Sequence, residues 1–282
     1  MVKLIECPRD AMQGWPTFIQ TEKKIEYINA LLKVGFHTID FGSFVSPKAI
    51  PQMADTKEVF SQLDLKSTNT KLLAIVANKR GAEEAAALKG IDYVGFPFSI
   101  SETFQQKNTQ SSIANSFNLV SDIQEICVSN NKQLVIYISM AFGNPYGDVY
   151  NEEIVFDWSK RISNLGVNII SLADTVGLAS ANQVKKITRS LIEALPNKEI
   201  GVHLHSAPDN WKEKVEAALE AGCKRFDGAL KGIGGCPLSG NDLVGNMNSE
   251  LMIPFFKELH LIEDLNEEAL RNCIELAGQI FV

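Results

Sequence analysis

The sequence predicts an α/β fold of the TIM (β/α)8 barrel type, with extra helices at the carboxyl end. Two observations support this prediction. Eight short β-rich runs recur along the chain, and a longer segment with helical periodicity follows each of them. Units of about 30 residues repeated eight times are typical of a closed parallel barrel, whereas open doubly wound sheets usually contain fewer strands.

The eight predicted strands are short and rich in β-branched, aliphatic and aromatic residues. In chain order they are VKLIEC (2–7), TIDFGSF (38–44), KLLAIVA (71–77), YVGFPFS (93–99), QLVIYISM (133–140), NIISLAD (168–174), EIGVHLH (199–205) and RFDGAL (225–230). Each run is followed by a stretch that is long enough for a helix, as a barrel of this type requires.

The predicted helices alternate with these strands. In 21–35, one face collects apolar residues and the other is mostly charged. The apolar residues are Ile25, Ile28, Leu31 and Leu32, and the charged ones are Glu22, Lys23, Lys24 and Glu26. Glycines that directly precede the next strand, at positions 35, 166 and 222, mark helix ends. We expect one TIM-barrel domain over 1–282, with the barrel at about 1–242 and a helical extension at about 243–282.

Composition excludes several classes of protein. The chain of 282 residues has 27 Lys and Arg against 34 Asp and Glu, a net charge of −7, so it lacks the basic face of a protein that coats nucleic acid. No leader and no apolar run of about 18 residues is present, and five scattered cysteines without a C-x-x-C pair indicate reduced thiols. We therefore expect a cytoplasmic protein that binds neither nucleic acid nor a membrane.

Polar residues gather where the predicted strands end. The active site of a TIM barrel is built at the C-terminal ends of its strands, so these residues are the candidates for chemistry. They are Arg9, Asp10, Asp40, Ser43, Asp174, Thr175, His203, His205, Cys236 and Asn246.

The segment His203-Leu204-His205 is the sharpest of these signals. Side chains two residues apart on a strand point to the same side, so both imidazoles can face one ion at the barrel mouth. With Asp10 after the first strand and an amide or water oxygen, they form a mixed nitrogen and oxygen set suited to Mg²⁺, Mn²⁺ or Co²⁺ rather than a closed thiolate zinc site. The alternative is a pair of buried, hydrogen-bonded histidines.

Two further residues suggest catalytic roles. Arg9 would place a fixed positive charge beside the metal, as a developing oxyanion needs, and the alternative is a surface ion pair at a loop. Cys236 lies in the glycine-rich segment KGIGGCPLSG (231–240), whose mobility would let the thiol enter the site. A lone loop cysteine is more often incidental.

At these residues nearly the whole chain resembles the 3-hydroxy-3-methylglutaryl-CoA (HMG-CoA) lyases of the DRE-TIM metallolyase superfamily. The motifs are ECPRDAMQG (6–14), SFVSPKAIPQM (43–53), SLADTVG (171–177), HLH (203–205), GIGGCP (232–237) and GNM (245–247). The SFVSPK and GxGGCP segments favour these lyases over the isopropylmalate, homocitrate and citramalate synthases and the hydroxy-oxovalerate aldolases.

The resemblance implies a divalent-metal-dependent carbon–carbon lyase that cleaves HMG-CoA to acetyl-CoA and acetoacetate, acts on a small-molecule acyl-CoA and forms a homodimer. It implies that Mg²⁺ or Mn²⁺ is bound by Asp10, His203, His205 and Asn246. The implied substrate-binding residues are Arg9, Gln13, Asp40, Ser43 and Asp174. Arg9 would stabilise the enolate of the departing acetyl-CoA, and the candidate proton carriers are Asp10, His203 and Cys236, which the sequence does not rank.

Four positions depart from the family pattern. Asp40 replaces a Glu and is one methylene shorter, and Ser206 replaces the carboxylate expected directly after the histidines. In the fifth strand Val135 replaces an Arg, and Asn144 replaces a Cys before Pro. These changes leave a second hypothesis open, a related metal-dependent aldolase or lyase for another 3-hydroxyacyl-CoA or a 4-hydroxy-2-oxo acid. A third hypothesis, a non-catalytic homologue, is disfavoured because every candidate metal ligand is present.

Overall fold

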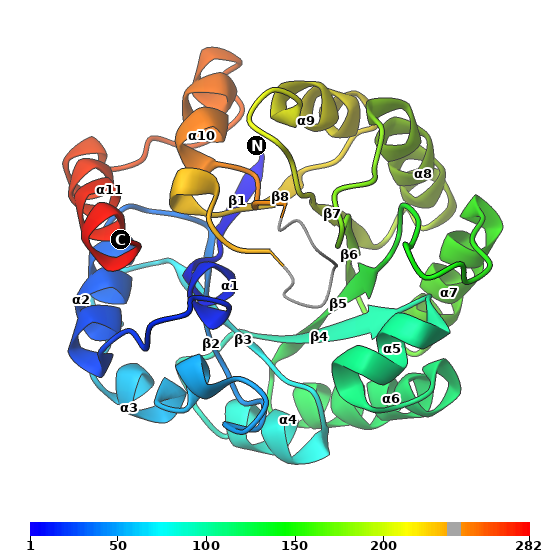
Figure 1. Cartoon of the computed structure of the whole chain (residues 1–282), viewed down its shortest axis with the longest axis horizontal. Helices are drawn as coiled ribbons and strands as arrows, with labels where there is room; N and C mark the ends of the chain where they lie inside the picture. Colours follow the sequence, from blue (N-terminus) through cyan, green and yellow to red (C-terminus); the bar gives the residue numbers. More distant parts are fainter. Residues whose placement is uncertain (236–243) are drawn as a thin grey trace.

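The computed structural model describes residues 1–235 and 244–282 and contains a closed barrel of eight parallel strands (Figure 1). The strands pair in chain order, and β8 closes the barrel against β1. They are β1 (Lys3–Glu6), β2 (Thr38–Ser43), β3 (Lys71–Ile75), β4 (Tyr93–Ser99), β5 (Gln133–Ser139), β6 (Ile169–Ala173), β7 (Glu199–His203) and β8 (Arg225–Gly228). The predicted TIM barrel and each of its eight strands are therefore confirmed.

Helices form a ring around the barrel, and α10 and α11 follow β8 as the predicted carboxyl-end helices (Figure 1). The described α-helices are α1 (Pro8–Gln13), α2 (Thr21–Leu31), α3 (Thr56–Ser61), α4 (Lys79–Ala86), α5 (Glu102–Thr109), α6 (Ile113–Ser129), α7 (Glu152–Asn164), α8 (Ala181–Ala194), α9 (Trp211–Glu220), α10 (Ser249–Glu258) and α11 (Glu267–Ile280). Short 3₁₀ turns lie at Pro51–Met53 and Leu230–Gly232.

Local sequence signals explain where these helices begin and end. In α8 the hydroxyl of Ser180 accepts from the Gln183 amide, while the Gln183 side chain accepts from the Ser180 amide. Such a capping box satisfies two amides that the helix itself leaves without partners. At the other end of the helices, the glycines at 35, 166 and 222 have φ of 95°, 90° and 94°, the left-handed conformation predicted for a helix stop.

One residue of α2 departs from the expected pattern. The periodicity groups Lys24 with the charged outer face, but its side chain is buried. Its ammonium pairs with Asp55 at 2.9 Å, and it also donates to the backbone oxygen of Gln52. Burying a lysine is tolerated because the ion pair and hydrogen bond replace its water. A partner 31 residues away in sequence is not visible in the local pattern.

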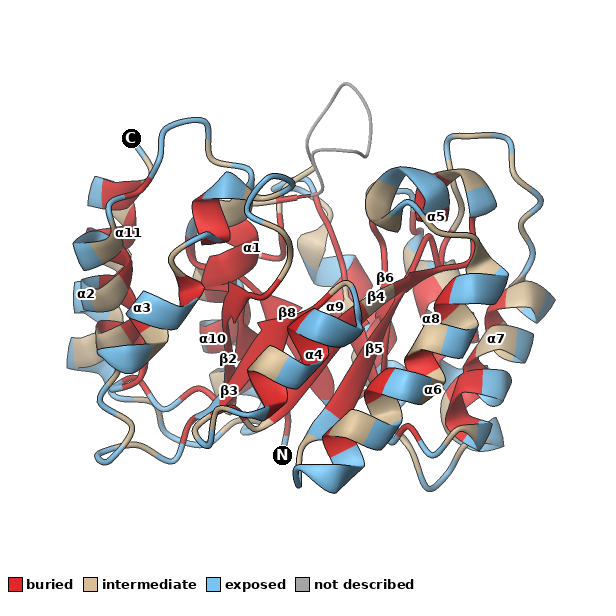
Figure 2. Ribbon diagram, turned by 90° about the horizontal axis from the view of Figure 1, so that it is seen from below, coloured by how far each residue is buried: buried red, intermediate tan, exposed pale blue. Residues whose placement is uncertain are grey.

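Apolar residues fill the barrel on both sides of its wall. The strands are buried, and the helices expose mainly their outer faces (Figure 2). An inner cluster comprises Leu73, Ile75, Tyr93, Val135, Tyr137 and Ile169. Val135 is fully buried in this cluster. Because side chains fill the interior, a ligand site must lie at the barrel mouth. None of the described helices has the length and apolar character needed to span a bilayer.

Candidate active site

A cavity of about 410 Å³ lies at the carboxyl ends of the strands, where the fold predicts an active site. Its wall includes six residues proposed from the sequence, namely Arg9, Asp10, Gln13, Thr175, His203 and His205. The rest of the wall includes apolar side chains and the end of α5, from Lys107 to Gln110. The volume is in the range of pockets that bind small organic molecules.

Two imidazoles from the end of β7 converge in this cavity. His203 is the last residue of the strand and His205 follows by two, so the strand's alternation turns both rings to the same side. Their Nε2 atoms lie 3.3 Å apart. Ligand atoms of both rings and of Asp10 all lie within 4.8 Å of one another. The predicted grouping of two nitrogens and one carboxylate is thus present.

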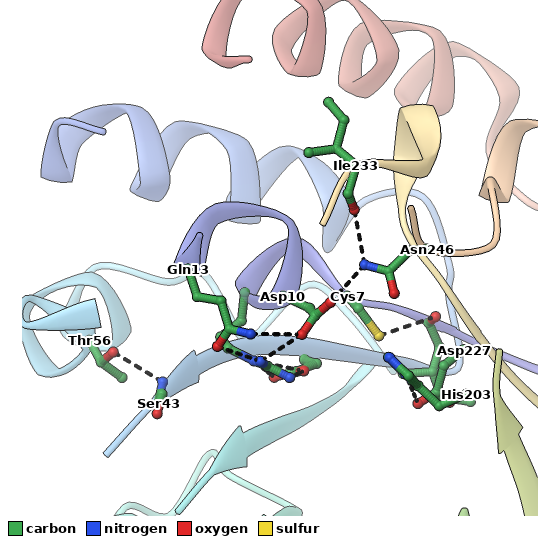
Figure 3. A network of polar contacts seen from close by, with 12 residues as sticks. Cys7, Asp10, Gln13, Ser43, Thr56, His203, Asp227, Ile233 and Asn246 are labelled. Atoms are coloured by element: carbon green, nitrogen blue, oxygen red, sulfur yellow. Dashed lines mark hydrogen bonds and ion pairs between the residues drawn. The ribbon is translucent and has the colours of Figure 1, made fainter. Parts of the chain in front are cut away.

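Asp10 is held by three side chains (Figure 3). Its Oδ1 accepts from Arg9 Nη1 at 2.9 Å and from Gln13 Nε2 at 3.0 Å, and its Oδ2 accepts from Asn246 Nδ2 at 2.7 Å. Burial works against ionisation, but Arg9, the nearby histidines and Asn246 hold the pKa of Asp10 at about 2. The group is therefore a carboxylate at neutral pH, the form that binds a cation.

Asn246 completes the predicted metal-binding set. Its amide nitrogen donates to Asp10 and to the backbone oxygen of Ile233, at 2.7 and 2.9 Å (Figure 3), so its carbonyl oxygen is the atom left for a cation. Gly234 permits this close approach. Its φ is 111°, and a Cβ at this position would lie 2.4 Å from Asn246 Nδ2. Any larger residue would displace the amide.

These donors fit a divalent cation. Ligand atoms bound at about 2.1 Å to one cation lie roughly 3 Å apart when they are neighbours in its shell, and the two imidazole nitrogens approach that separation. Burial and the neighbouring His203 lower the pKa of His205 to about 4, so its ring is neutral and carries a lone pair. Burial also acts on His203, but the hydrogen bond and charge of Asp227 raise its pKa overall.

Arg9 is fixed by Asp40 on β2. Its Nε lies 3.0 and 3.2 Å from the two carboxylate oxygens, and its Nη2 also donates to one of them. The shorter aspartate therefore reaches the site by contacting Arg9, although it does not itself line the cavity. Burial raises the pKa of Asp40 to about 6, against the influence of Arg9. The rigid fork of this pair orients the guanidinium toward the cavity.

Two other proposed substrate-binding residues lie behind the cavity wall. Asp174 pairs with Lys214 at 2.9 Å and accepts from the Ala179 amide. Ser43 is buried, and its hydroxyl accepts from the Val45 amide. Neither side chain lines the cavity, and their contact with substrate stays a prediction. Cys236 lies outside the described residues, so its catalytic role also stays a prediction from the resemblance.

The sequence alone did not point to three residues that the structure places at or behind the site. Asp227 contacts His203, Lys214 contacts Asp174 and His205, and Lys107 lines the cavity. Asp227 could have been noticed in the sequence. It is a charged residue in the predicted eighth strand, two residues from Arg225, and strand alternation turns both side chains to the same side. Lys214 carried none, because charged residues on a helix usually face water.

A family model described as HMGL-like matches residues 2–276. The chain belongs to the HMGL-like family. It is 31% identical to hydroxymethylglutaryl-CoA lyase YngG of Bacillus subtilis, over 93% of this chain and 87% of that protein. It is 30% identical to the (R)-citramalyl-CoA lyase of Chloroflexus aurantiacus, over 93% of this chain and 85% of that protein.

A solved structure of similar fold is that of an HMG-CoA lyase from Acinetobacter baumannii in complex with coenzyme A and 3-methylmalate. The TM-score is 0.92 and the identity 31%, and the match covers 100% of this chain and 91% of that one. The family membership inferred from the sequence motifs is therefore confirmed.

Proposed function

We propose that this protein is a divalent-metal-dependent carbon–carbon lyase that cleaves HMG-CoA to acetyl-CoA and acetoacetate. The observation that carries the proposal is the convergence of Asp10, His203, His205 and Asn246 in one cavity, with Arg9 beside them. Lyases named for HMG-CoA are similar over nearly the whole chain. The cavity also has room for an acyl group.

In this proposal Asp10, His203, His205 and Asn246 hold Mg²⁺ or Mn²⁺. When bound, such a cation would lower the pKa of the tertiary 3-hydroxyl of the substrate. The ionised Asp10 and the neutral ring of His205 suit the cation without a change of protonation. Gln13 and Arg9 hold one oxygen of Asp10, which limits its rotation.

The reaction then needs a base, an oxyanion partner and an acid. A base takes the proton of the 3-hydroxyl, the bond between C2 and C3 breaks, C3 becomes the ketone of acetoacetate, and the electron pair passes to the thioester as an enolate. Arg9, oriented by Asp40, stabilises that enolate oxygen. An acid then protonates C2 to give acetyl-CoA. The candidate proton carriers are His203, Asp10 and Cys236.

A second substrate deserves a direct comparison. A relative named (R)-citramalyl-CoA lyase is about as similar in sequence as those named for HMG-CoA. Purified protein with Mn²⁺ should therefore be assayed with HMG-CoA and (R)-citramalyl-CoA in parallel. We expect the higher kcat/KM with HMG-CoA. A higher value with citramalyl-CoA would retain the metal-dependent lyase but replace its substrate.

The remaining proposals are broader. A homodimer, a cytoplasmic location and a single domain over 1–282 follow from the sequence and the family resemblance. Light scattering in solution would test the dimer, with a mass of about two chains expected and a mass of one chain contradicting it.

A further inference from the structure

We propose that Asp227 is the positioning residue that fixes the ring orientation and tautomer of His203. The carboxylate Oδ2 of Asp227 lies 3.2 Å from His203 Nδ1 (Figure 3). On the other side of the ring, His203 Nε2 faces His205 Nε2. The inference rests on the metal site of the proposed function. It adds to that site a residue that does not line the cavity and is not one of the proposed metal ligands.

The hydrogen bond dictates which ring nitrogen carries the proton. An ionised carboxylate only accepts, so the proton of a neutral imidazole must sit on Nδ1 when Asp227 is its partner. The lone pair is then on Nε2, the atom turned toward His205 and Asp10. A carboxylate behind a metal-binding histidine also raises the basicity of the ring and limits its rotation.

Asp227 is poorly explained as a residue that serves stability alone. It is 2% exposed, and burying a carboxylate is costly unless the group is well hydrogen-bonded. Its other oxygen, Oδ1, is buried and has no hydrogen-bond partner among the described residues. The contact with His203 is therefore the one hydrogen bond that its carboxylate makes there. The fold accepts the cost of burying this carboxylate for a single hydrogen bond, which indicates that the hydrogen bond with His203 has a role in the site.

Two neighbours surround the pair of Asp227 and His203, namely Arg225 beside the carboxylate and Tyr137 beside the ring. Arg225 lies two residues earlier on β8, so both side chains point into the barrel, and its buried guanidinium attracts the carboxylate. The ring of Tyr137 meets the His203 ring edge-on, with centroids 5.8 Å apart. His203 is thus limited by an aromatic wall on one side and by Asp227 at Nδ1.

Cys7 also approaches this pair, within 4.8 Å of ligand atoms of His203 and Asp227. A second metal site here would need His203 Nδ1 as a ligand. The distance of 3.2 Å between that nitrogen and Asp227 is a hydrogen-bond length, and the Cys7 thiol lies against the backbone oxygen of Ile5. The geometry therefore favours a hydrogen bond over a second ion.

The first test is the tautomer of His203 in the metal-free wild-type protein. Nitrogen-15 NMR of the imidazoles, with the His203 signals assigned by their loss in His203→Gln, should find the neutral ring protonated at Nδ1. A ring protonated at Nε2 would overturn the proposal. This measurement requires neither metal nor substrate, so it decides the role of Asp227 even if the proposed lyase activity is absent.

The second test is Mn²⁺ affinity, measured by calorimetry or electron paramagnetic resonance. Asp227→Asn should raise the Kd for Mn²⁺ about 10- to 100-fold, the usual effect of losing such a partner. The matched control is Glu199→Gln, which removes a carboxylate from the same strand as His203 and from the same Arg225, and should leave the Kd unchanged. Equal affinities of Asp227→Asn and wild type would overturn the proposal. A wild type that binds no Mn²⁺ would instead contradict the metal site of the proposed function.

Discussion

Lys214 holds the backbone of His205 from behind the site, with its ammonium 2.8 Å from the His205 carbonyl oxygen. The same ammonium pairs with Asp174 at 2.9 Å, and both side chains are 1% exposed. One cation on α9 thereby joins the ends of β6 and β7. It supports this histidine although Ser206 stands where the family resemblance predicts a carboxylate.

Removing this cation should destabilise the fold. Lys214→Met leaves Asp174 buried without its partner, and breaking a buried pair in this way costs about 3–5 kcal/mol. Chemical denaturation should show this loss, and the double variant with Asp174→Asn should recover part of it. Lys212→Met, on an exposed lysine of the same helix, is the control. An unfolding midpoint of Lys214→Met equal to that of wild type would contradict the assignment.

His205→Ala should abolish Mn²⁺ binding at micromolar metal and, with it, turnover. The substitution removes one of the two converging nitrogens, and the ring is buried where water replaces it poorly. Binding is measured by calorimetry. His260→Asn, at an exposed histidine in the turn after α10, should bind metal as wild type does. Retention of full turnover by His205→Ala at saturating metal would exclude it as a ligand.

Arg9→Met should lower kcat about 10²- to 10³-fold, the range seen when an oxyanion donor is lost. Asp40→Asn should also lower kcat, because it weakens the fork that orients Arg9. Steady-state kinetics measures both. Arg80→Met, which breaks an exposed pair with Glu84, is the control for loss of an arginine. Unchanged kcat in Arg9→Met would remove Arg9 from the chemistry.

Glu6 should make stability depend on pH. Burial raises its pKa from 4.5 to about 8, against the hydrogen bonds from Ser249 and Leu230. The folded state thus keeps a proton that the unfolded state loses, so its stabilising contribution is full below pH 4.5 and is lost as pH rises to about 8. Each pH unit in this window lowers the free energy of unfolding by up to about 1.4 kcal/mol.

Glu6→Gln should remove this slope, because an amide can still accept from the Leu230 amide but does not ionise. Denaturation across the same pH range provides the measurement, with the exposed Glu26→Gln as the control. A slope in Glu6→Gln as steep as that of wild type would assign the pH dependence to other groups.

Cys236→Ala should lower turnover and leave Mn²⁺ affinity nearly unchanged, if the thiol carries a proton as the family resemblance implies. Kinetics and metal titration of the same preparation separate the two effects. A collapse of metal binding would make the thiol a ligand, and unchanged turnover would make it incidental.

The eight strands were predictable because a parallel barrel buries both faces of each strand. Such strands appear in the sequence as short, mainly apolar runs. The pair His203 and His205 was predictable for a related reason, since strand alternation alone turns both to one side. The position of the site at the carboxyl ends of the strands followed from the fold class. The local sequence pattern was therefore sufficient to predict the barrel and the two histidines of the candidate site.

Contacts between distant segments were not predictable in the same way. Asp40 meets Arg9 across 31 positions, and Lys214 meets Asp174 across 40. The neighbouring sequence does not distinguish any of these residues from an ordinary exposed charged residue. Only the closed barrel places the partners together. The contact of Asp227 with His203 depends in addition on the pairing of β7 with β8.

The most direct test of the account is the product formed from HMG-CoA by protein stripped of metal with a chelator and then resupplied with Mn²⁺ or Mg²⁺. We predict that acetoacetate and acetyl-CoA form in equal amounts with metal, and that neither forms without it. Metal bound to the wild-type protein with no acetoacetate produced would contradict HMG-CoA as the substrate. Equal rates with and without metal would contradict the metal-dependent mechanism.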